Sequence, residues 1–501
     1  MTGPAADPVA TAYELIGQGR PLEALELLEP LSRRPQASHG ELAAYAEALK
    51  ATGRKDEALA IYQRAITIAP RSGVAEHNLA ALQGDLGQHQ AAEAGARRAF
   101  AKGLDAPETW IVLARALQGQ HRHDEAMAAY GEAVRRRPAM VEAHRDLAQL
   151  IWMQTGDAAA ATAGLRAAAQ AYPDEPGLAI QLAKALQAVG DHDGAYTVLL
   201  ASIARWPEPL AGLELAASTA AASLKETVAA QRHAERAVQA APGNDQAEIA
   251  LIDAHLGLGR AGPAARLAQG LLDRAPDDQR ALARLATAWR LMDDERYRAL
   301  YDYDAFVRGA VINVPPGWTD LDGYLADLAA ALRAAHGFRA HPFDQSLRGG
   351  AQTQTDLGQL EDPAIRAFFQ AIDGPIRAYM AALGQGEDPL RRRNTGEYGI
   401  AGAWSVRLRP HGFHVDHIHH MGWLSSACHI ELPAAALDRD REGWLKFGEP
   451  GIATQPKLAA ERFVRPEPGR LVLFPSYMWH GTVPFSGEAD RLSIAFDVVP
   501  A

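Results

Sequence analysis

The chain has little of what marks secreted, membrane-spanning or nucleic-acid-binding proteins. Its 501 residues include one cysteine, Cys428, which excludes an intramolecular disulfide and a cysteine-based zinc site. No run of about 18 apolar residues occurs, so we expect no membrane-spanning helix. The formal net charge of −11 argues against a general nucleic-acid binder. The first residues lack the basic start and apolar core of a signal peptide, and we therefore expect a cytoplasmic protein.

Prolines recur at a nearly constant interval through the first 280 residues or so. They are Pro35, Pro70, Pro138, Pro173, Pro207, Pro242 and Pro276. The successive spacings are 35, 68, 35, 34, 35 and 34 residues, and 68 is two periods of 34. Small and aromatic residues return in phase with them, such as Ala58 and Tyr62 in one unit and Ala126 and Tyr130 in another. A period of this length indicates stacked pairs of antiparallel helices, each pair ended by a proline.

This pattern resembles the tetratricopeptide repeat. The resemblance covers about residues 8–300, roughly eight units followed by a capping helical segment. The 211–242 unit departs from the pattern because it lacks the glycine of the turn between the helices. Each unit of such a solenoid buries its apolar face against its neighbours and leaves a concave groove. The resemblance implies a groove that holds a protein or peptide, with a spacer or assembly scaffold as the plainer alternative.

After about residue 305 the period is lost and the sequence favours an antiparallel β domain with flanking helices. Two amphipathic helices are expected within residues 311–337 and 361–383. Four strands are expected at residues 403–409, 425–432, 469–475 and 491–499. In the last strand one face is apolar and the other presents Arg491 and Ser493. Trp423 and Trp479 are expected to pack inside this domain.

A third of the chain's 18 histidines lie within two dozen residues of this domain. They are His411, His414, His417, His419, His420 and His429. Two pairs at i and i+2 occur here, His414 with Asp416 and His417 with His419, and such residues lie on the same side of a strand. Non-haem Fe(II) is held by two histidines and a carboxylate on one face of the metal. A distant third ligand is offered by His480, which follows a strand and a turn.

This ordered set, with an arginine after the distal histidine, resembles the Fe(II)- and 2-oxoglutarate-dependent oxygenases. Segments 344–354, 422–427, 469–485 and 491–500 are similar to a bacterial and phage subfamily, some of whose members are fused to tetratricopeptide repeats. The resemblance covers about residues 305–501 and implies a double-stranded β-helix, a cupin-like jelly roll. It also implies Fe(II), 2-oxoglutarate and O2 as cofactors. Arg491 and Ser493 would hold the far carboxylate of 2-oxoglutarate, and His429 stands where the subfamily often has a tyrosine that binds it.

The resemblance leaves three ligand sets open. The His-x-His habit of the subfamily favours His417 and His419 with His480, and the His-x-Asp pattern of the superfamily favours His414 and Asp416 with His480. A mixed set would combine Asp416 with His417. Because Asp416 and His417 are adjacent, an extended strand points them to opposite sides, so the two pairs are not expected to bind the metal together. We expect the three-histidine set.

The function that follows is a dioxygenase that hydroxylates a side chain of a protein or peptide recruited by the repeats. One alternative is a small-molecule hydroxylase whose repeats serve assembly, and another is a catalytically silent interaction scaffold. A structural zinc site would also gather histidines, but it would not require Arg491 and Ser493. We expect two separable domains, a repeat solenoid at residues 8–300 and an oxygenase domain at residues 305–501.

Overall fold

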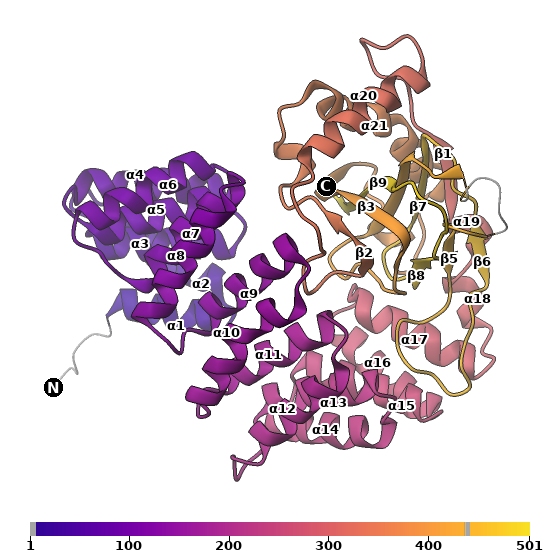
Figure 1. Ribbon diagram of the computed structural model, residues 1–501, viewed down its shortest axis with the longest axis horizontal. Coiled ribbons are helices and arrows are strands. Elements are labelled where there is room, and N and C mark those ends of the chain that lie inside the picture. Colours follow the sequence, from indigo (N-terminus) through magenta and orange to yellow (C-terminus); the bar gives the residue numbers. More distant parts are fainter. Residues whose placement is uncertain (1–6, 435, 437–440) are drawn as a thin grey trace. The chain divides into compact units, whose positions relative to one another are not determined.

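The computed structural model describes residues 7–434, 436 and 441–501, which form two compact units divided between Leu150 and Ile151. Helices α1 to α17 follow one another along the chain, and within each unit neighbouring helices pair as antiparallel hairpins, such as α7 with α8 and α13 with α14 (Figure 1). Their bounds are α1 Pro8–Gly17, α2 Pro21–Ser32, α3 His39–Ala51, α4 Lys55–Ile68, α5 Gly73–Asp85, α6 His89–Ala101, α7 Pro107–Gly119, α8 His123–Arg136, α9 Val141–Thr155, α10 Ala158–Ala171, α11 Pro176–Ala188, α12 His192–Ile203, α13 Ala211–Ser223, α14 Thr227–Ala240, α15 Asp245–Gly257, α16 Ala261–Arg274 and α17 Gln279–Leu291. The predicted tetratricopeptide-like solenoid is confirmed.

The turns between the two helices of a unit share one backbone conformation. A glycine with positive φ occupies this turn in several units, including Gly53 at +80° and Gly190 at +90°. Where the glycine is missing, Lys225 adopts a φ of +63° and His121 a φ of +59°. The recurring prolines each follow the end of a second helix, because a proline cannot continue the backbone hydrogen bonding of the helix. The weak 211–242 unit therefore keeps the turn geometry at the expense of a strained lysine.

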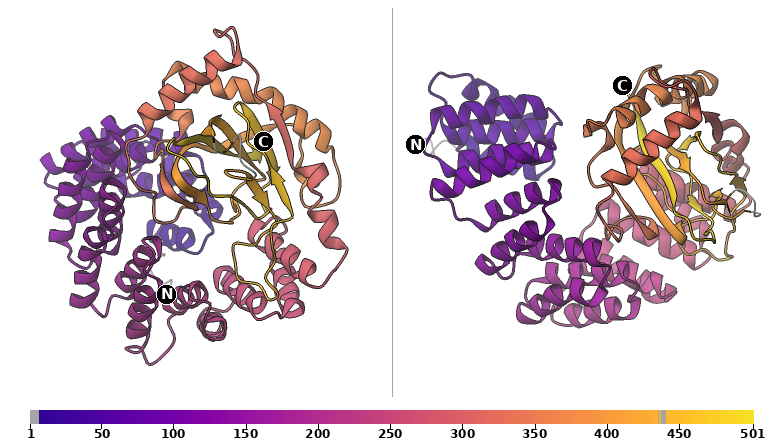
Figure 2. Two further views of the ribbon diagram at one scale, coloured as in Figure 1. Left: turned by 45° about the vertical axis from the view of Figure 1, so that its right-hand side comes forward. Right: turned by 45° about the horizontal axis from the view of Figure 1, so that its top comes forward.

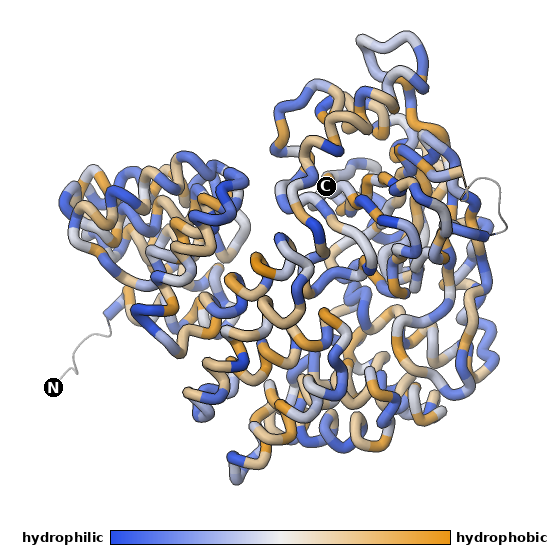
Figure 3. The backbone as a smooth tube through the Cα atoms, in the orientation of Figure 1, coloured by the Kyte–Doolittle hydropathy of each residue, from blue (hydrophilic) through white to orange (hydrophobic). Residues whose placement is uncertain are grey.

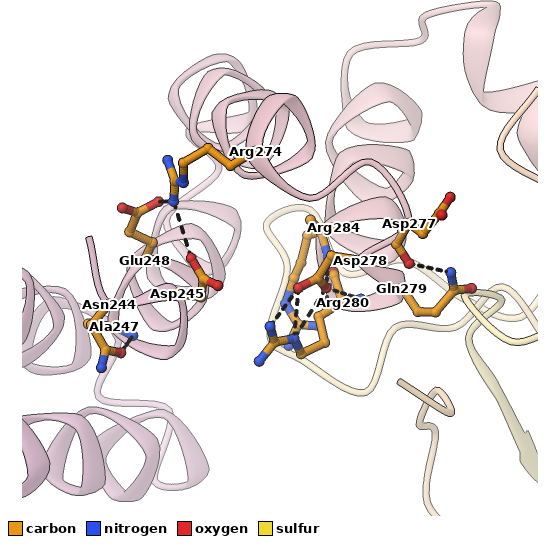
Figure 4. A network of polar contacts seen from close by, with 11 residues as sticks. Asn244, Asp245, Ala247, Glu248, Arg274, Asp277, Asp278, Gln279, Arg280 and Arg284 are labelled. Carbon is orange, nitrogen blue, oxygen red and sulfur yellow. Dashed lines mark hydrogen bonds and ion pairs between the residues drawn. The ribbon is translucent and has the colours of Figure 1, made fainter. Parts of the chain in front are cut away.

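Polar side chains cap the helices of the last repeats and join neighbouring helices there (Figure 4). Asp278 caps α17 by accepting hydrogen bonds from the amides of Arg280 and Ala281 at 2.8 and 3.1 Å. Arg274 at the end of α16 forms an ion pair with Glu248 in α15 at 2.8 Å. Arg284 in α17 forms an ion pair with Asp253 in α15 at 2.7 Å. Hydrophobic and hydrophilic residues are interspersed along these helices (Figure 3). Each helix pair therefore buries its apolar face, and its polar face carries the contacts described above.

The C-terminal domain contains two antiparallel sheets. The six-stranded sheet has the order β1-β7-β4-β9-β3-β2 and the three-stranded sheet the order β6-β5-β8. The strands are β1 Arg308–Val311, β2 Leu347–Gln352, β3 Tyr398–His414, β4 Leu424–Glu431, β5 Leu445–Phe447, β6 Arg462–Val464, β7 Arg470–Pro475, β8 His480–Thr482 and β9 Arg491–Pro500. Helices α20 (Leu321–Ala335) and α21 (Pro363–Leu383) cover the larger sheet (Figure 2). Two short helices, α18 (Arg296–Leu300) and α19 (Tyr303–Phe306), join this domain to the repeats.

Strand β9 lies between β3 and β4 and divides its residues between the two faces of the sheet. Its apolar residues Ile494 and Phe496 are fully buried in the core beneath α20 and α21, and Phe368 of α21 meets Phe496 edge-on. Its alternate residues, which include Arg491 and Ser493, line a cavity on the other face. The alternation read from the sequence therefore gives the faces of this strand correctly.

The hydrophobic core does not stop where the repeat period stops. One cluster of buried residues extends from Ile249 in α15 to Val498 in β9. Trp479, which is 5% exposed, donates from its indole nitrogen to the hydroxyl of Thr287 in α17 at 3.0 Å. The hydroxyl of Tyr301 donates to the carbonyl of Tyr477 at 3.0 Å. The last repeats and the β domain thus share one core within the second compact unit.

Among the described residues, no helix combines the length and the apolarity needed to cross a membrane.

Candidate metal centre

Three histidines meet where two strand ends come together. Strand β3 ends at His414, and the chain that leaves it carries His417 and His419. His480 begins β8 and pairs with His417 through two backbone hydrogen bonds of 2.9 and 3.0 Å. This bridge brings a residue of the distal strand beside the i, i+2 pair.

The imidazoles of these three residues converge. One ring nitrogen from each lies within 4.8 Å of the others. The two Nε2 atoms of His417 and His419 are 3.2 Å apart. Two nitrogen ligands at right angles on one metal lie roughly 3 Å apart when each metal–nitrogen distance is about 2.1 Å. The spacing of the pair therefore fits a shared transition-metal ion.

The opposite ring nitrogens are all engaged. Nδ1 of His417 donates to the carbonyl of Val415 at 2.8 Å, and Nδ1 of His480 donates to the carbonyl of Met478 at 2.9 Å. Nδ1 of His419 lies 2.6 Å from the carboxylate of Asp497. A proton on each Nδ1 leaves the lone pair of each Nε2 free, which is the arrangement that orients histidines toward a metal.

Burial favours the neutral form of His417 and His480. Burial and the neighbouring histidine lower the pKa of His417 to about 3, and burial also holds the pKa of His480 well below its ordinary value. A neutral imidazole is the form that binds a divalent metal. The set His417, His419 and His480 therefore has the donors and the spacing that such an ion requires.

The second i, i+2 pair lies apart from this set. Asp416 forms an ion pair with Lys446 of β5 at 2.8 Å. Burial raises the pKa of the Asp416 carboxyl, and the hydrogen bond from Lys446 opposes that rise. His414 hydrogen-bonds the hydroxyl of Ser346 at 3.0 Å, and the same hydroxyl lies 3.2 Å from Nε2 of His417. His414 thus reaches the centre through Ser346, and Asp416 turns toward the smaller sheet.

Arg491 is a buried cation on the same cavity. Its side chain is 2% exposed, and it donates to the carbonyl of Gly443 at 2.7 Å and to Nδ1 of His429 at 3.1 Å. No described carboxylate pairs with it, and its Nε has no partner among the described residues. Burial lowers the pKa of Arg491 to about 10. A buried guanidinium with this surplus of donors fits an anionic ligand.

His429 is oriented by Arg491. Because an arginine only donates, Nδ1 of His429 accepts and its proton lies on Nε2, a buried atom without a partner among the described residues. Burial and the charge of Arg491 hold the pKa of His429 well below its ordinary value. His429 stands opposite Ser493 in the β4–β9 register. Arg491 and Ser493 line the cavity.

The cavity beside Arg491, whose described lining does not include His429, has a volume of about 480 Å³. The three converging histidines, Arg491 and Ser493 all line it. Met421, 73% exposed, stands on its rim, so the cavity opens to solvent.

Several residues of this site were not anticipated from the sequence. Trp404 stacks on His419 with ring centroids 5.7 Å apart, and Ser346 joins His414 to His417. The carboxylate of Asp497 lies 2.6 Å from Nδ1 of His419. Its position in the alternation of β9, on the side of Arg491 and Ser493, is the one signal that could have placed it here.

Comparison with known families agrees with this architecture. Residues 402–497 match the family described as "Putative 2OG-Fe(II) oxygenase". Residues 42–72 and 107–140 match the tetratricopeptide repeat. The chain therefore combines tetratricopeptide repeats with an oxygenase-family domain. No curated protein sequence matches it.

The solved structures similar to this chain include helical repeat proteins. The yeast Tom70 crystal structure has 16% identity and a TM-score of 0.44, over 56% of this chain and 60% of that one. A tetratricopeptide repeat protein from Parabacteroides merdae has 16% identity and a TM-score of 0.34, over 49% and 96%. The structure of Naa15/Naa10 bound to HypK-THB has 22% identity and a TM-score of 0.28, and the match spans 53% of this chain but only 42% of that one.

Proposed function

We propose that the protein is an Fe(II)- and 2-oxoglutarate-dependent dioxygenase that hydroxylates a side chain of a protein or peptide recruited by its repeats. The observation that carries this proposal is the meeting of three converging imidazoles and one buried arginine in a single cavity. A structural zinc site would explain the imidazoles but not the arginine. Within the chain, we assign the repeats to residues 8–300 and the oxygenase domain, a double-stranded β-helix, to residues 305–501.

His417, His419 and His480 would hold the iron through their Nε2 atoms, with Nδ1 fixed by Val415, Asp497 and Met478. Three protein ligands leave positions for 2-oxoglutarate and O2. When bound, these groups together supply the oxidant for C–H hydroxylation, with 2-oxoglutarate converted to succinate and CO2.

In this proposal the chain's own residues would orient 2-oxoglutarate and limit the access of water to the metal site. Arg491 would receive the far carboxylate of 2-oxoglutarate, and Ser493 and the Nε2 proton of His429 would add hydrogen bonds. Because Nδ1 of His429 accepts a hydrogen bond from Arg491, His429 would hold the guanidinium in place. Its Nε2 proton would remain available to 2-oxoglutarate. Trp404 covers one side of His419 and limits the water that reaches it.

An anaerobic titration of the full chain with Fe(II) and 2-oxoglutarate tests this function. We expect a weak visible charge-transfer band that requires both additions, and its absence in a His480→Ala variant. A chain that binds iron but develops no band with 2-oxoglutarate would contradict the proposal.

The substrate is tested separately. A cell lysate treated with the active chain should contain a protein whose side chain gains one oxygen, and the His480→Ala variant should not produce it. Turnover of 2-oxoglutarate by small molecules alone, with no modified protein, would instead favour the small-molecule hydroxylase.

A further inference from the structure

A second cavity, of about 500 Å³, lies between the repeats and the segment that leads into β2. Trp152 of α9 and Ala188 of α11 line one side, and Arg339, His341 and Arg409 line the other. The amide of Arg339 donates to the carbonyl of Met153 at 2.8 Å, which joins the two sides. None of these residues takes part in the candidate metal centre.

Two ring nitrogens in this wall are buried and lack partners. Nε1 of Trp152 and Nε2 of His341 have no hydrogen-bond partner among the described residues. His341 is 5% exposed, and its ring meets Trp152 edge-on with centroids 5.8 Å apart. Nδ1 of His341 donates to the backbone carbonyl of Ala188, so Nε2 carries a lone pair. Because buried polar atoms in proteins are nearly always paired, the indole N–H in this wall calls for an acceptor.

The charged residues that line the cavity are all positive. Arg339 and Arg409 are exposed residues of its lining, and neither forms an ion pair with a described carboxylate. No acidic residue is found in the described lining. Burial, with the charges of Arg348 and Arg409, lowers the pKa of His341 to about 4. In a chain with a net charge of −11, two unpaired arginines beside an unpaired indole N–H are a concentrated set of donors.

We propose that this cavity binds an anionic oxygen group, a carboxylate or a phosphate, with Trp152, Arg339 and Arg409 as its donors. Guanidinium groups pair with both anions through two parallel hydrogen bonds, and the indole N–H adds a third direction. His341 packs edge-on against the indole of Trp152, and because its Nε2 carries a lone pair it is not among the donors. This site is separate from the proposed oxygenase chemistry and holds whether or not that chemistry is correct.

The test is a calorimetric titration of the full chain with two probes. One arm uses inorganic phosphate. The other uses a peptide of alternating glutamate and alanine whose two ends are chemically blocked. The first variant is Arg339→Ala/Arg409→Ala, which removes two exposed side chains. The second is Trp152→Phe, which keeps a ring but removes the N–H. The matched control is Arg166→Ala/Arg266→Ala, which removes two other exposed arginines for which the structure shows no ion pair. Each titration is repeated in an Arg491→Ala background, because Arg491 offers anions a different cavity.

We expect saturable binding of at least one probe, weakened about tenfold or more by the double variant and several-fold by Trp152→Phe. The control and the Arg491→Ala background should leave it unchanged. Binding of phosphate but not peptide identifies a free anion as the ligand, and the reverse identifies an acidic side chain of a polypeptide. Equal weakening in the control, or no saturable binding of either probe, overturns the proposal.

Discussion

At the scale of single residues, the histidine cluster shows how adjacent positions acquire different tasks. The chain beyond β3 turns His417 and His419 toward His480, and Asp416, which directly precedes His417, turns toward Lys446. The proton on each Nδ1 is fixed by a carbonyl or a carboxylate, so the lone pairs face inward. Without a metal ion, the two Nε2 lone pairs 3.2 Å apart would repel each other.

We predict that His417→Ala, His419→Ala and His480→Ala each abolish Fe(II) binding, because each removes one of only three protein ligands. Asp416→Asn should retain the metal, since Asp416 pairs with Lys446 instead. Asp497→Asn should weaken binding by about 10–100-fold by releasing His419. Metal content after anaerobic loading, with circular dichroism to confirm folding, measures all five. Loss of iron in Asp416→Asn with retention in His419→Ala would establish the His414 and Asp416 set instead.

The second residue-scale prediction concerns Arg491. Arg491→Ala should weaken 2-oxoglutarate by tens to hundreds of fold, because a buried carboxylate loses its charged partner at a cost of about 2–4 kcal/mol. Fe(II) affinity should stay nearly unchanged, since the arginine is not a ligand. Dependence of turnover on 2-oxoglutarate concentration gives the first quantity, and metal titration gives the second. An Arg491→Ala chain with ordinary 2-oxoglutarate dependence would remove Arg491 from the binding site.

At the scale of elements, long patterns could be predicted from the sequence and short ones could not. Strands β3, β4, β7 and β9 were predicted because each carries enough alternation or apolar length to be recognised. The strands of the smaller sheet have three residues each, too few to show a period. The sequence also identified His417, His419 and His480 as candidate metal ligands. Ser346 directly precedes β2 and Trp404 lies in β3, and neither residue has a local sequence pattern that predicts its place in the site.

The turns of the repeats permit a stability prediction. Lys225 is exposed and holds a φ of +63° where most units have glycine. Lys225→Gly should raise the free energy of unfolding by roughly 0.5–1 kcal/mol, because glycine adopts this conformation without a Cβ clash. Lys225→Ala is the control: it loses the same side chain but keeps the clash. Chemical denaturation of the three chains decides the matter, and equal stability of the glycine and alanine variants would show that strain at this turn is negligible.

At the scale of the whole molecule, the end of the repeat period and the end of the shared core differ. The carbonyl of Met478 fixes His480, and Tyr477 and Trp479 flank Met478. Trp479 is hydrogen-bonded to α17, the last repeat helix, and Tyr477 to the segment that follows it. Arg290 of α17 donates to the carbonyls of Gly448 and Ala459 at 2.7 and 2.9 Å. The final repeats therefore support the strand that carries the distal histidine, which a boundary drawn from the repeat period alone does not reveal.

We therefore predict that fragments cut at different points behave differently. A fragment of residues 141–501 keeps α9 whole, retains the shared core and should bind Fe(II) and 2-oxoglutarate like the full chain. A fragment that begins at residue 301 loses Thr287 and Arg290, exposes the apolar surface around Trp479, and should aggregate or lose the metal. Size-exclusion chromatography and anaerobic metal titration compare the two. In the full chain, Thr287→Val should weaken iron binding more than Thr219→Val, an exposed threonine on α13, because only Thr287 holds Trp479. A soluble 301–501 fragment with ordinary iron and 2-oxoglutarate binding would show that the oxygenase domain needs no support from the repeats.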